Sequence, residues 1–330
     1  MKNKGFTLVE LLAVIAVLLI LITLITPKVI NQLNSSEDVT QQEQINTLIN
    51  IAKIYTNQNT EKLPENNSIS VITVQELKES GLINKSQILD PKTKEELTGC
   101  ILIKDENNKY NYEYNEDTCN NLITVTFDPQ GGQLDQTSKN VIPNETYGEL
   151  PTPTREGYTF MGWNGKNMFD EKSILMAIAG AKYEDGHYVF SAAQAHNAYG
   201  GITGDSYIGT KQMNIEYKEN TRYTLTINGY SEYIESANRY GNLYYGFFCK
   251  EGKKLSTVRE ENIYKMTNDA NTTVENISFS YGLGGKAYIS YIQLEEGSVS
   301  TPYEPYYITP TTTVVQENNH TLKAIWQANS

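Results

Sequence analysis

The chain has 330 residues, which is enough for more than one domain. Its 39 Asp and Glu residues outnumber its 27 Lys and Arg residues, and the net charge of −12 argues against a protein that binds nucleic acid through a basic surface. The 24 Tyr residues, against 8 Phe and 2 Trp, favour β-rich modules that face water or sugars.

The N-terminus is a short basic leader, Met1 to Gly5, followed by an apolar run over residues 6–26. As a helix this run would span roughly 30 Å, enough to cross a bilayer. It contains one acid, Glu10, and a carboxylate at membrane depth costs about 2.5–3.5 kcal/mol, which indicates a function. A secretory signal peptide would have a shorter apolar core and a cleavage site after it. A plain signal anchor would leave the acid unexplained.

The order of basic leader, Gly5, Phe6 and Glu10 resembles the N-terminal signal of type IV prepilins and pseudopilins. The resemblance implies that a prepilin peptidase cleaves between Gly5 and Phe6 and methylates the new Phe6 amine. Glu10 would then pair with the Phe6 amine of a neighbouring subunit, and Pro27 would kink the helix. Apolar residues continue at helical spacing, which predicts a long helix over residues 6–60, although its second half is also compatible with an amphipathic linker helix.

Residues 61–121 are expected to form a small globular unit that resembles those of Gram-positive pseudopilins. A strand leads into a short helix that ends at Gly81, and an Asp-Pro turn precedes a hairpin bounded by Cys100 and Cys119. A disulfide between these cysteines would contribute about 3 kcal/mol, whereas a zinc site lacks a nearby His or second Cys pair. We expect Cys249 to be a buried strand residue without a partner.

Two motifs, VTFDPQGG and LPTPTREGYTFMGW, follow Leu122, and a third, HTLKAIW, stands near the C-terminus. They resemble the InlB-type B repeat, a small β-grasp-like module of bacterial surface proteins. The third motif lies about 155 residues after Trp163, so the repeat is expected over residues 122–163 plus 309–327, split by an insertion. We interpret Trp163 and Trp326 as core residues in preference to a ligand platform.

The insertion, residues 164–308, contains short alternating strands separated by Gly and Asn turns, which predicts a β-sandwich or jelly roll. Its first and last segments, GKNMFD and IQLEEGSVSTPYEPY, resemble the carbohydrate-binding-like jelly rolls of phage tail and cell-surface proteins. Its tyrosines either line a sugar-binding face or fill the sandwich, and no ligand-binding residue is assigned. The candidates are Tyr230, Tyr233, Tyr240, Tyr244, Tyr245, Tyr281 and Tyr288.

No catalytic pattern stands out in the sequence. The histidines His187, His196 and His320 lie far apart and have no metal-ligand spacing, and the spacing of Asp185 and Asp205 does not support a calcium site. Nucleophile elbows, phosphate-binding glycine loops and catalytic cysteine signatures are missing. We therefore expect no enzyme, no cofactor and no metal.

The expected fold class is α+β multidomain: a long N-terminal pilin-like helix with a small antiparallel sheet, then a β-grasp-like repeat containing an inserted β-sandwich. The expected function is a non-enzymatic, minor subunit of a type IV pilus or of a type II secretion or competence-type pseudopilus, displaying an adhesion or glycan-binding module. Its expected partners are other pilin subunits, the prepilin peptidase, the membrane and a glycan or host surface. It would be a single-pass membrane protein with an extracytoplasmic body, and extracellular once assembled. The alternative is a membrane-anchored adhesin or receptor that never assembles. A third possibility, an enzyme acting on cell-wall glycans, is not supported because the sequence has no paired-carboxylate signature.

Overall fold

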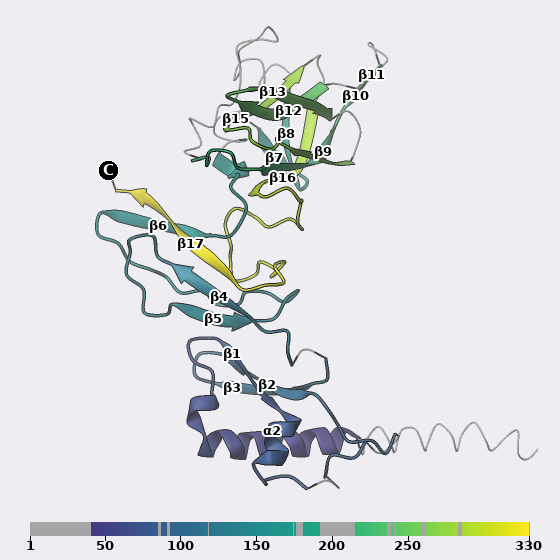
Figure 1. Cartoon of the computed structure of the whole chain (residues 1–330), viewed down its shortest axis with the longest axis vertical. Helices are drawn as coiled ribbons and strands as arrows, with labels where there is room; N and C mark the ends of the chain where they lie inside the picture. Colours follow the sequence, from purple (N-terminus) through teal and green to yellow (C-terminus); the bar gives the residue numbers. More distant parts are fainter. Residues whose placement is uncertain are drawn as a thin grey trace, which may run out of the picture. The chain divides into compact units, whose positions relative to one another are not determined.

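The computed structural model describes residues 41–84, 87–90, 93–117, 119–173, 175, 181–191, 215–235, 239–240, 242–258, 262–282 and 286–329. The chain divides into two compact units, Met1–Leu122 and Ile123–Ser330, and each is described by itself. In the first unit a helix packs on a small sheet, and the second unit consists of sheets (Figure 1).

The described residues are mostly β-sheet, so the expected α+β class with a long N-terminal helix is wrong. Helix in the described segments is limited mainly to residues 41–58, the 3-10 turn η1 (Thr60–Lys62) and α2 (Val74–Glu79). The physical reason is that a period-two pattern with Gly and Asn turns runs through the much longer part of the chain after residue 122. The expected membrane-spanning segment, residues 6–26, lies outside the described residues. Among those that are described, no helix is long and apolar enough to cross a membrane.

In the first unit, the helix over residues 41–58 lies against an antiparallel sheet of order β1-β2-β3 (Figure 1). The strands are β1 (Ile69–Thr73), β2 (Cys100–Asp105) and β3 (Tyr110–Asn115). The core is apolar because Leu48 and Ala52 on one side of the helix pack with Ile101 and Ile103 of the central strand. The hydroxyls of Thr56 and Tyr112 are 2.7 Å apart and join the helix to β3.

The second unit begins with a four-stranded sheet of order β5-β4-β17-β6. Its strands are β4 (Ile123–Asp128), β5 (Ser138–Val141), β6 (Tyr158–Asn164) and β17 (His320–Ala328). The last strand of the chain, β17, is central: it pairs in parallel with β4 and antiparallel with β6 (Figure 1). We call this sheet with its loops the repeat.

The two tryptophans belong to the hydrophobic core of the repeat. Trp163 is 1% exposed and packs against Phe127, with 5.0 Å between ring centroids, which confirms its interpretation as a core residue. Trp326 is half-buried and meets Phe160 edge to face. Its indole N–H donates a hydrogen bond to the carbonyl of Pro129, which connects β17 to the turn after β4.

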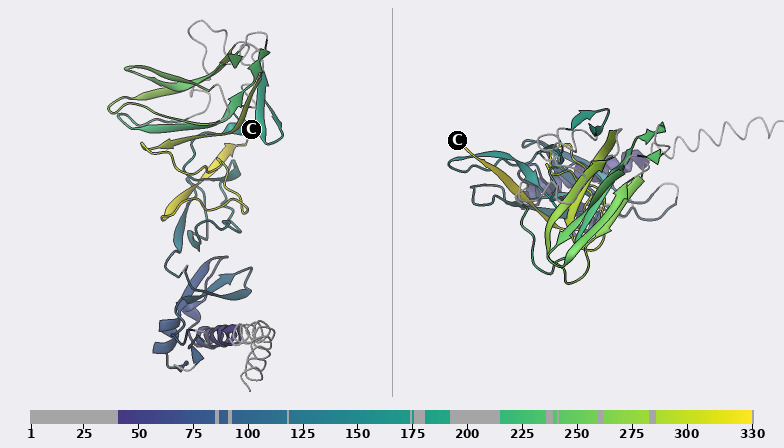
Figure 2. Two further views of the ribbon diagram at one scale, coloured as in Figure 1. Left: turned by 90° about the vertical axis from the view of Figure 1, so that its right-hand side faces the viewer. Right: turned by 90° about the horizontal axis from the view of Figure 1, so that it is seen from above.

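The segment between β6 and β17 forms two sheets that face each other as two layers (Figure 2). We call them the sandwich. The five-stranded sheet has the order β14-β9-β16-β8-β7 and the three-stranded sheet the order β13-β12-β15, with a small pair β10-β11 beside them. The strand bounds are β7 Lys182–Glu184, β8 His187–Ser191, β9 Tyr223–Ser231, β10 Tyr233–Ile234, β11 Arg239–Tyr240, β12 Asn242–Cys249, β13 Gly252–Val258, β14 Asn262–Thr267, β15 Val274–Gly282 and β16 Lys286–Glu296.

The sandwich core is built by alternation along these strands. Leu225 and Ile227 of β9 and Ile292 and Leu294 of β16 are at most 1% exposed and pack with Phe247 of β12 from the opposite sheet. Residues between them point to the outer face of the five-stranded sheet, because successive strand residues face opposite sides.

Candidate functional site

The residues expected to carry processing and assembly, Gly5, Phe6, Glu10 and Pro27, lie outside the described residues. The described residues nevertheless contain three features of functional interest. They are a disulfide in the first unit, a buried polar junction between the repeat and the sandwich, and an aromatic area on the outer face of the sandwich.

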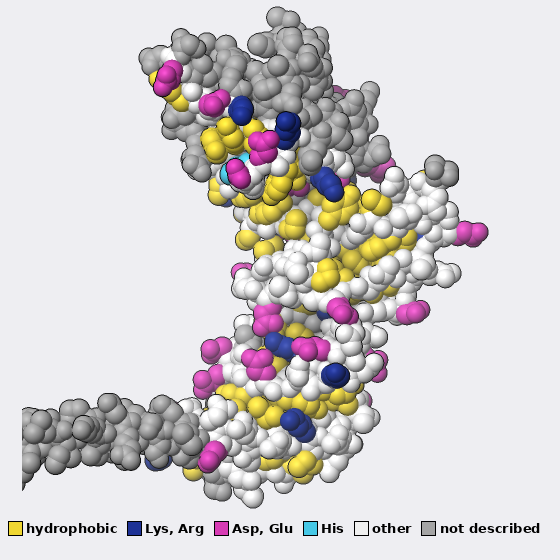
Figure 3. Space-filling view, turned by 180° about the vertical axis from the view of Figure 1, so that it is seen from behind, with side chains coloured by type: hydrophobic (Ala, Val, Ile, Leu, Met, Phe, Trp, Pro, Cys, Tyr) yellow, Lys and Arg dark blue, Asp and Glu magenta, His cyan; other side chains and the backbone are white. Residues whose placement is uncertain are grey.

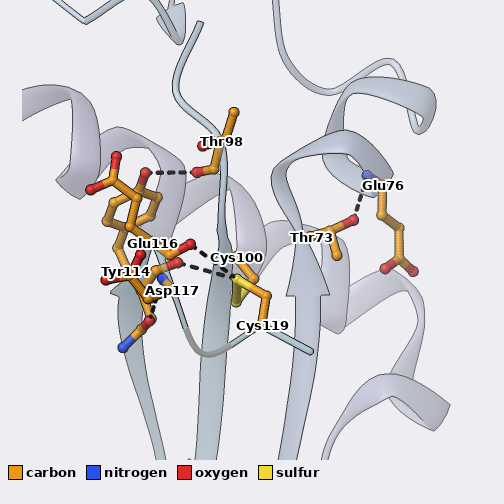
Figure 4. Close-up of a disulfide and its surroundings, with 9 residues drawn as sticks. Thr73, Glu76, Thr98, Cys100, Tyr114, Glu116, Asp117 and Cys119 are labelled. Atoms are coloured by element: carbon orange, nitrogen blue, oxygen red, sulfur yellow. Dashed lines mark hydrogen bonds between the residues drawn. A yellow bond between two sulfur atoms is a disulfide. The ribbon is translucent and has the colours of Figure 1, made fainter. Parts of the chain in front are cut away.

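The disulfide joins Cys100 to Cys119 at the base of the β2–β3 hairpin, and their Cα atoms are 5.6 Å apart (Figure 4). Beside it the hydroxyl of Tyr114 donates to the carbonyl of Thr98 at 2.6 Å. The bond therefore ties the segment after β3 to the start of the central strand. Cys249, at the end of β12, is a free, partly buried thiol whose pKa is raised by burial.

The junction begins with two asparagines in the segment that enters the sandwich. The side-chain amide of Asn164 donates to the carbonyls of Asn167 at 2.8 Å and Tyr306 at 2.7 Å. Asn167 is fully buried, and its amide nitrogen donates to the carbonyls of Ile292 and Glu304, both at 3.1 Å. Its oxygen accepts from two backbone N–H groups of the sandwich. These bonds hold the entering and leaving segments side by side.

Glu304 is the buried acid of the junction, and it is 0% exposed. Its carboxylate accepts hydrogen bonds from the backbone N–H of Lys166 at 2.8 Å and from the amide of Gln316 at 2.9 Å. The hydroxyl of Tyr147, a buried residue of the repeat, lies 3.4 Å from the carboxylate and 2.8 Å from Nε2 of His320. A Cβ atom at position 165 would collide with the carboxylate, so glycine is required at Gly165.

A short segment, residues 297–304, crosses the outer face of the five-stranded sheet, and we call it the exit strap. It is bonded to side chains of that face: Thr226 to Ser300, and Glu295 to both the N–H and the hydroxyl of Thr301. Gln293, fully buried beneath it, accepts from the N–H of Glu304 at 2.8 Å. The strap covers one half of the outer face, and the partly buried side chains of His187, Tyr230 and Tyr288 lie on the other half.

These three residues form an aromatic cluster, which we call the aromatic face. The rings of Tyr230 and Tyr288, directly paired across β9 and β16, are stacked with centroids 4.6 Å apart and planes 8° apart. The imidazole of His187 from β8 meets both rings edge-on, at 5.8 and 6.3 Å. At the border with the strap, Tyr291 stacks on Tyr303 at 4.2 Å.

The seven tyrosines that were candidates for a sugar-binding face do not lie on one surface. Tyr245 is 1% exposed and belongs to the core, while Tyr233 and Tyr244 are 44% and 37% exposed. The side chains of Tyr240 and Tyr281 lie outside the described residues. Among the predicted tyrosines whose side chains are described, Tyr230 and Tyr288 stack on each other. Sequence reasoning missed His187, Tyr291 and Tyr303 as members of the cluster. Alternation along β8 was the signal available for His187. Alternation along β16 would have placed Tyr291 on the face opposite to Tyr288, and a register shift between Ile289 and Tyr291 brings both to the same face.

Two buried ionisable groups flank these features. Burial raises the pKa of Glu171 to about 7, although the hydroxyl of Tyr303 donates to this carboxyl at 2.9 Å. In the repeat, burial lowers the pKa of Lys139 to about 8, and its ammonium donates to the carbonyls of Tyr147 and Glu149, both at 2.9 Å. Among the residues that are described, the side-chain partner of Glu171 is Tyr303, and Lys139 bonds to backbone carbonyls, so neither arrangement activates a nucleophile.

No cluster of three or more potential metal ligands is found among the residues that the structure describes. Asp205 and His196 lie outside them, and the carbonyl of Asp185 is 2.9 Å from Nδ1 of His187. Among the side chains that are coloured in Figure 3, acidic and basic groups are intermingled.

Comparisons with known proteins match two segments. Residues 1–26 match the prokaryotic N-terminal methylation motif, and residues 124–175 match the Listeria–Bacteroides repeat domain. The second match covers β4, β5 and β6 and runs into the insertion, while β17 lies outside it. No curated protein matches the chain.

One solved structure, titled "BiXyn10A CBM1 APO", is similar to this chain at 16% identity, over 43% of this chain and 92% of that one, with a TM-score of 0.24. A TM-score this low does not establish a common fold. The methylation motif implies processing by a prepilin peptidase and assembly with other pilin-type subunits, as in membrane-anchored or extracellular pilus proteins. The chain therefore combines a prepilin-type N-terminal methylation motif with a Listeria–Bacteroides repeat.

Proposed function

We propose that the chain is a non-enzymatic, minor subunit of a type IV pilus or a related pseudopilus, and that it presents the sandwich for binding at the cell surface. The methylation motif at residues 1–26 carries this proposal. In it, Glu10 pairs with the methylated Phe6 amine of the next subunit, because a carboxylate among packed apolar segments needs a positive partner. The repeat and the sandwich are then the displayed body.

Two measurements test the first part. Mass spectrometry of the membrane or filament fraction should find a chain that begins at N-methyl Phe6, and a chain that begins at Met1 would refute processing. Glu10→Ala should abolish incorporation into filaments while membrane insertion persists. The matched control is Glu43→Ala, which removes the same charge from an exposed position on the described helix and should assemble normally.

The same experiment separates the alternative. A membrane-anchored adhesin that never assembles would be recovered only in the membrane fraction, whether or not Glu10 is present. Incorporation of the Glu10→Ala protein at the unsubstituted level would contradict the assembly role of this residue.

For the sandwich we propose a neutral sugar ligand that rests on the aromatic face. Aromatic rings offer apolar surface to the C–H groups of a sugar, while tyrosine hydroxyls and an imidazole offer hydrogen bonds to its hydroxyls. The half of the outer face that is not covered by the exit strap provides these groups together: Tyr230, Tyr288 and His187. The strap, with Tyr303 stacked on Tyr291, borders the area on one side.

The ligand proposal is tested with the purified full chain on a panel of immobilised neutral and charged glycans. Tyr288→Ala and Tyr230→Ala should each weaken binding to neutral glycans, and because each ring contributes of the order of 1–3 kcal/mol, the loss in affinity should be about 5- to 150-fold. The control is Tyr183→Ala, which removes a tyrosine that is 58% exposed on the edge strand β7. Equal binding by all three variants, or binding only to charged glycans, would contradict the proposal. A glycan-hydrolysis assay on the same preparation tests the non-enzymatic role.

A further inference from the structure

The sheet of the repeat is completed by a strand that follows the whole sandwich in the chain. Its central strand β17 begins at His320, whereas its neighbour β6 ends at Asn164. Closing a loop of this length from an unfolded chain costs entropy that grows with the logarithm of its length. In the folded protein the ends of the insertion are held together, since Asn164 donates to the carbonyl of Tyr306 at 2.7 Å.

The exit strap is shared by the two sub-structures. Its residue Thr301 is bonded to Glu295 on the sandwich sheet, and its last residue, Glu304, is bonded to Gln316 and close to Tyr147 of the repeat. Glu295, Tyr147 and Glu304 are all at most 3% exposed. Separating the repeat from the sandwich would leave several buried polar groups without hydrogen bonds, which is costly for each group.

We propose that the repeat and the sandwich fold and unfold as one cooperative unit, coupled by the exit strap and Glu304. The folded sandwich delivers β17 to the gap between β4 and β6, and the repeat in return fixes the strap against the sheet. A ligand that binds to the sandwich and stabilises it then also stabilises the repeat. This coupling follows from the topology and the junction, and it does not rest on the proposed function.

The chain contains its own pair of probes for this coupling. Its two tryptophans, Trp163 and Trp326, both lie in the repeat, so tryptophan fluorescence reports on the repeat alone. Cys249 is the one cysteine outside the disulfide, and it lies in the sandwich, so its rate of alkylation reports on the opening of the sandwich. Both are measured on the full chain, in detergent, along a urea titration.

The decisive variant is Phe247→Leu, which loosens the sandwich core on β12 without touching the repeat. We expect the fluorescence midpoint to fall by the same urea interval as the alkylation midpoint. A fall in the alkylation midpoint with an unchanged fluorescence midpoint would overturn the proposal. Val125→Ala, in the core of the repeat, gives the reciprocal test, and it should lower the alkylation midpoint of Cys249 as well.

Glu304→Gln tests the coupling element. The amide cannot accept from both the N–H of Lys166 and the side chain of Gln316, so the two midpoints should separate in this variant. The control is Glu296→Gln, the same change at an exposed residue whose ion pair with Lys218 lies on the surface, and here the midpoints should stay together. Coincident midpoints in Glu304→Gln would show that this residue does not couple the two parts.

Discussion

The indole N–H of Trp326 donates a hydrogen bond to the carbonyl of Pro129, 197 residues earlier in the chain, at 2.9 Å. The contact joins the closing strand of the repeat to the turn that follows its first strand. Gly132 in the same turn lies so close to the indole ring that a Cβ atom would be 2.6 Å from it. The strand that completes the repeat therefore also shapes the turn at its beginning.

We predict that Gly132→Ala destabilises the second unit by about 1–3 kcal/mol, the usual cost of an overpacked core. The added methyl group meets both the ring of Trp326 and the carbonyl of Thr154, and neither is the free end of a flexible side chain. Urea unfolding followed by tryptophan fluorescence measures the change. Gln133→Ala, at the exposed neighbouring position, should leave the free energy of unfolding within about 0.5 kcal/mol of that of the unsubstituted protein.

We predict that the sandwich loses stability as the pH rises from 4.5 to 7. Burial raises the pKa of Glu171 from 4.5 to about 7, so in this window the folded protein binds a proton that the unfolded chain has released. The penalty is absent below pH 4.5 and complete above pH 7, where it reaches at most about 3 kcal/mol. Urea midpoints at pH 5 and pH 8 measure it.

Glu171→Gln should flatten this pH dependence, because the amide stays neutral while the hydroxyl of Tyr303 can still donate to its oxygen. The comparison variant is Glu184→Gln, an exposed acid on β7, which should keep the full dependence. If the two variants had the same profile, the buried carboxyl would not be the cause.

Because of Lys139, we predict that the stability of the second unit rises with pH above pH 8, the opposite of the trend expected from Glu171. Burial lowers the pKa of its ammonium from 10.5 to about 8, so between these values the unfolded chain holds a proton that the folded protein has lost. Stability should therefore rise with pH, by about 2 kcal/mol between pH 8 and 9.5. Lys139→Met should remove the rise and Lys109→Met, at an exposed turn position, should not. Fluorescence-detected urea unfolding at these pH values decides between them.

Loss of the Cys100–Cys119 bond should act on the first unit alone. In the chain-entropy model a loop of this size contributes about 3 kcal/mol, so replacing both cysteines by serine should destabilise that unit by about this amount. Hydrogen exchange of β2 and β3 amides measures the loss. The tryptophan-detected midpoint of the second unit is the internal control and should not move, since both tryptophans lie there.

Local patterns predicted much of the secondary structure. The hairpin between Cys100 and Cys119, the short helix before Gly81 and the strands of the repeat are all written in nearest-neighbour chemistry: alternation, turn residues and a left-handed glycine, whose φ is +75°. The fold class was misjudged because the most distinctive pattern, at the N-terminus, occupies a small part of the chain. The described remainder is mostly sheet.

The polar junction was beyond prediction from the sequence. Asn167, Gln293 and Glu304 read as solvent-facing residues in polar segments, yet each is 0% exposed. They are buried because some of their hydrogen-bond partners are remote in the chain and meet them only after folding: Ile292 is 125 residues from Asn167, and Lys166 is 138 residues from Glu304. No local pattern contains that information.

The methylation motif, the strands and turns of the repeat and the β-rich insertion between its second and last motifs can be recognised from the amino-acid order alone. These depend on residues close together in the chain, whose chemistry acts locally. It takes the folded chain to show that β17 is a central strand, that Tyr230 and Tyr288 stack beside His187, and that Glu304 is buried between repeat and sandwich. Such contacts depend on strand pairing across long loops, which is settled by burial and hydrogen bonding of the whole chain.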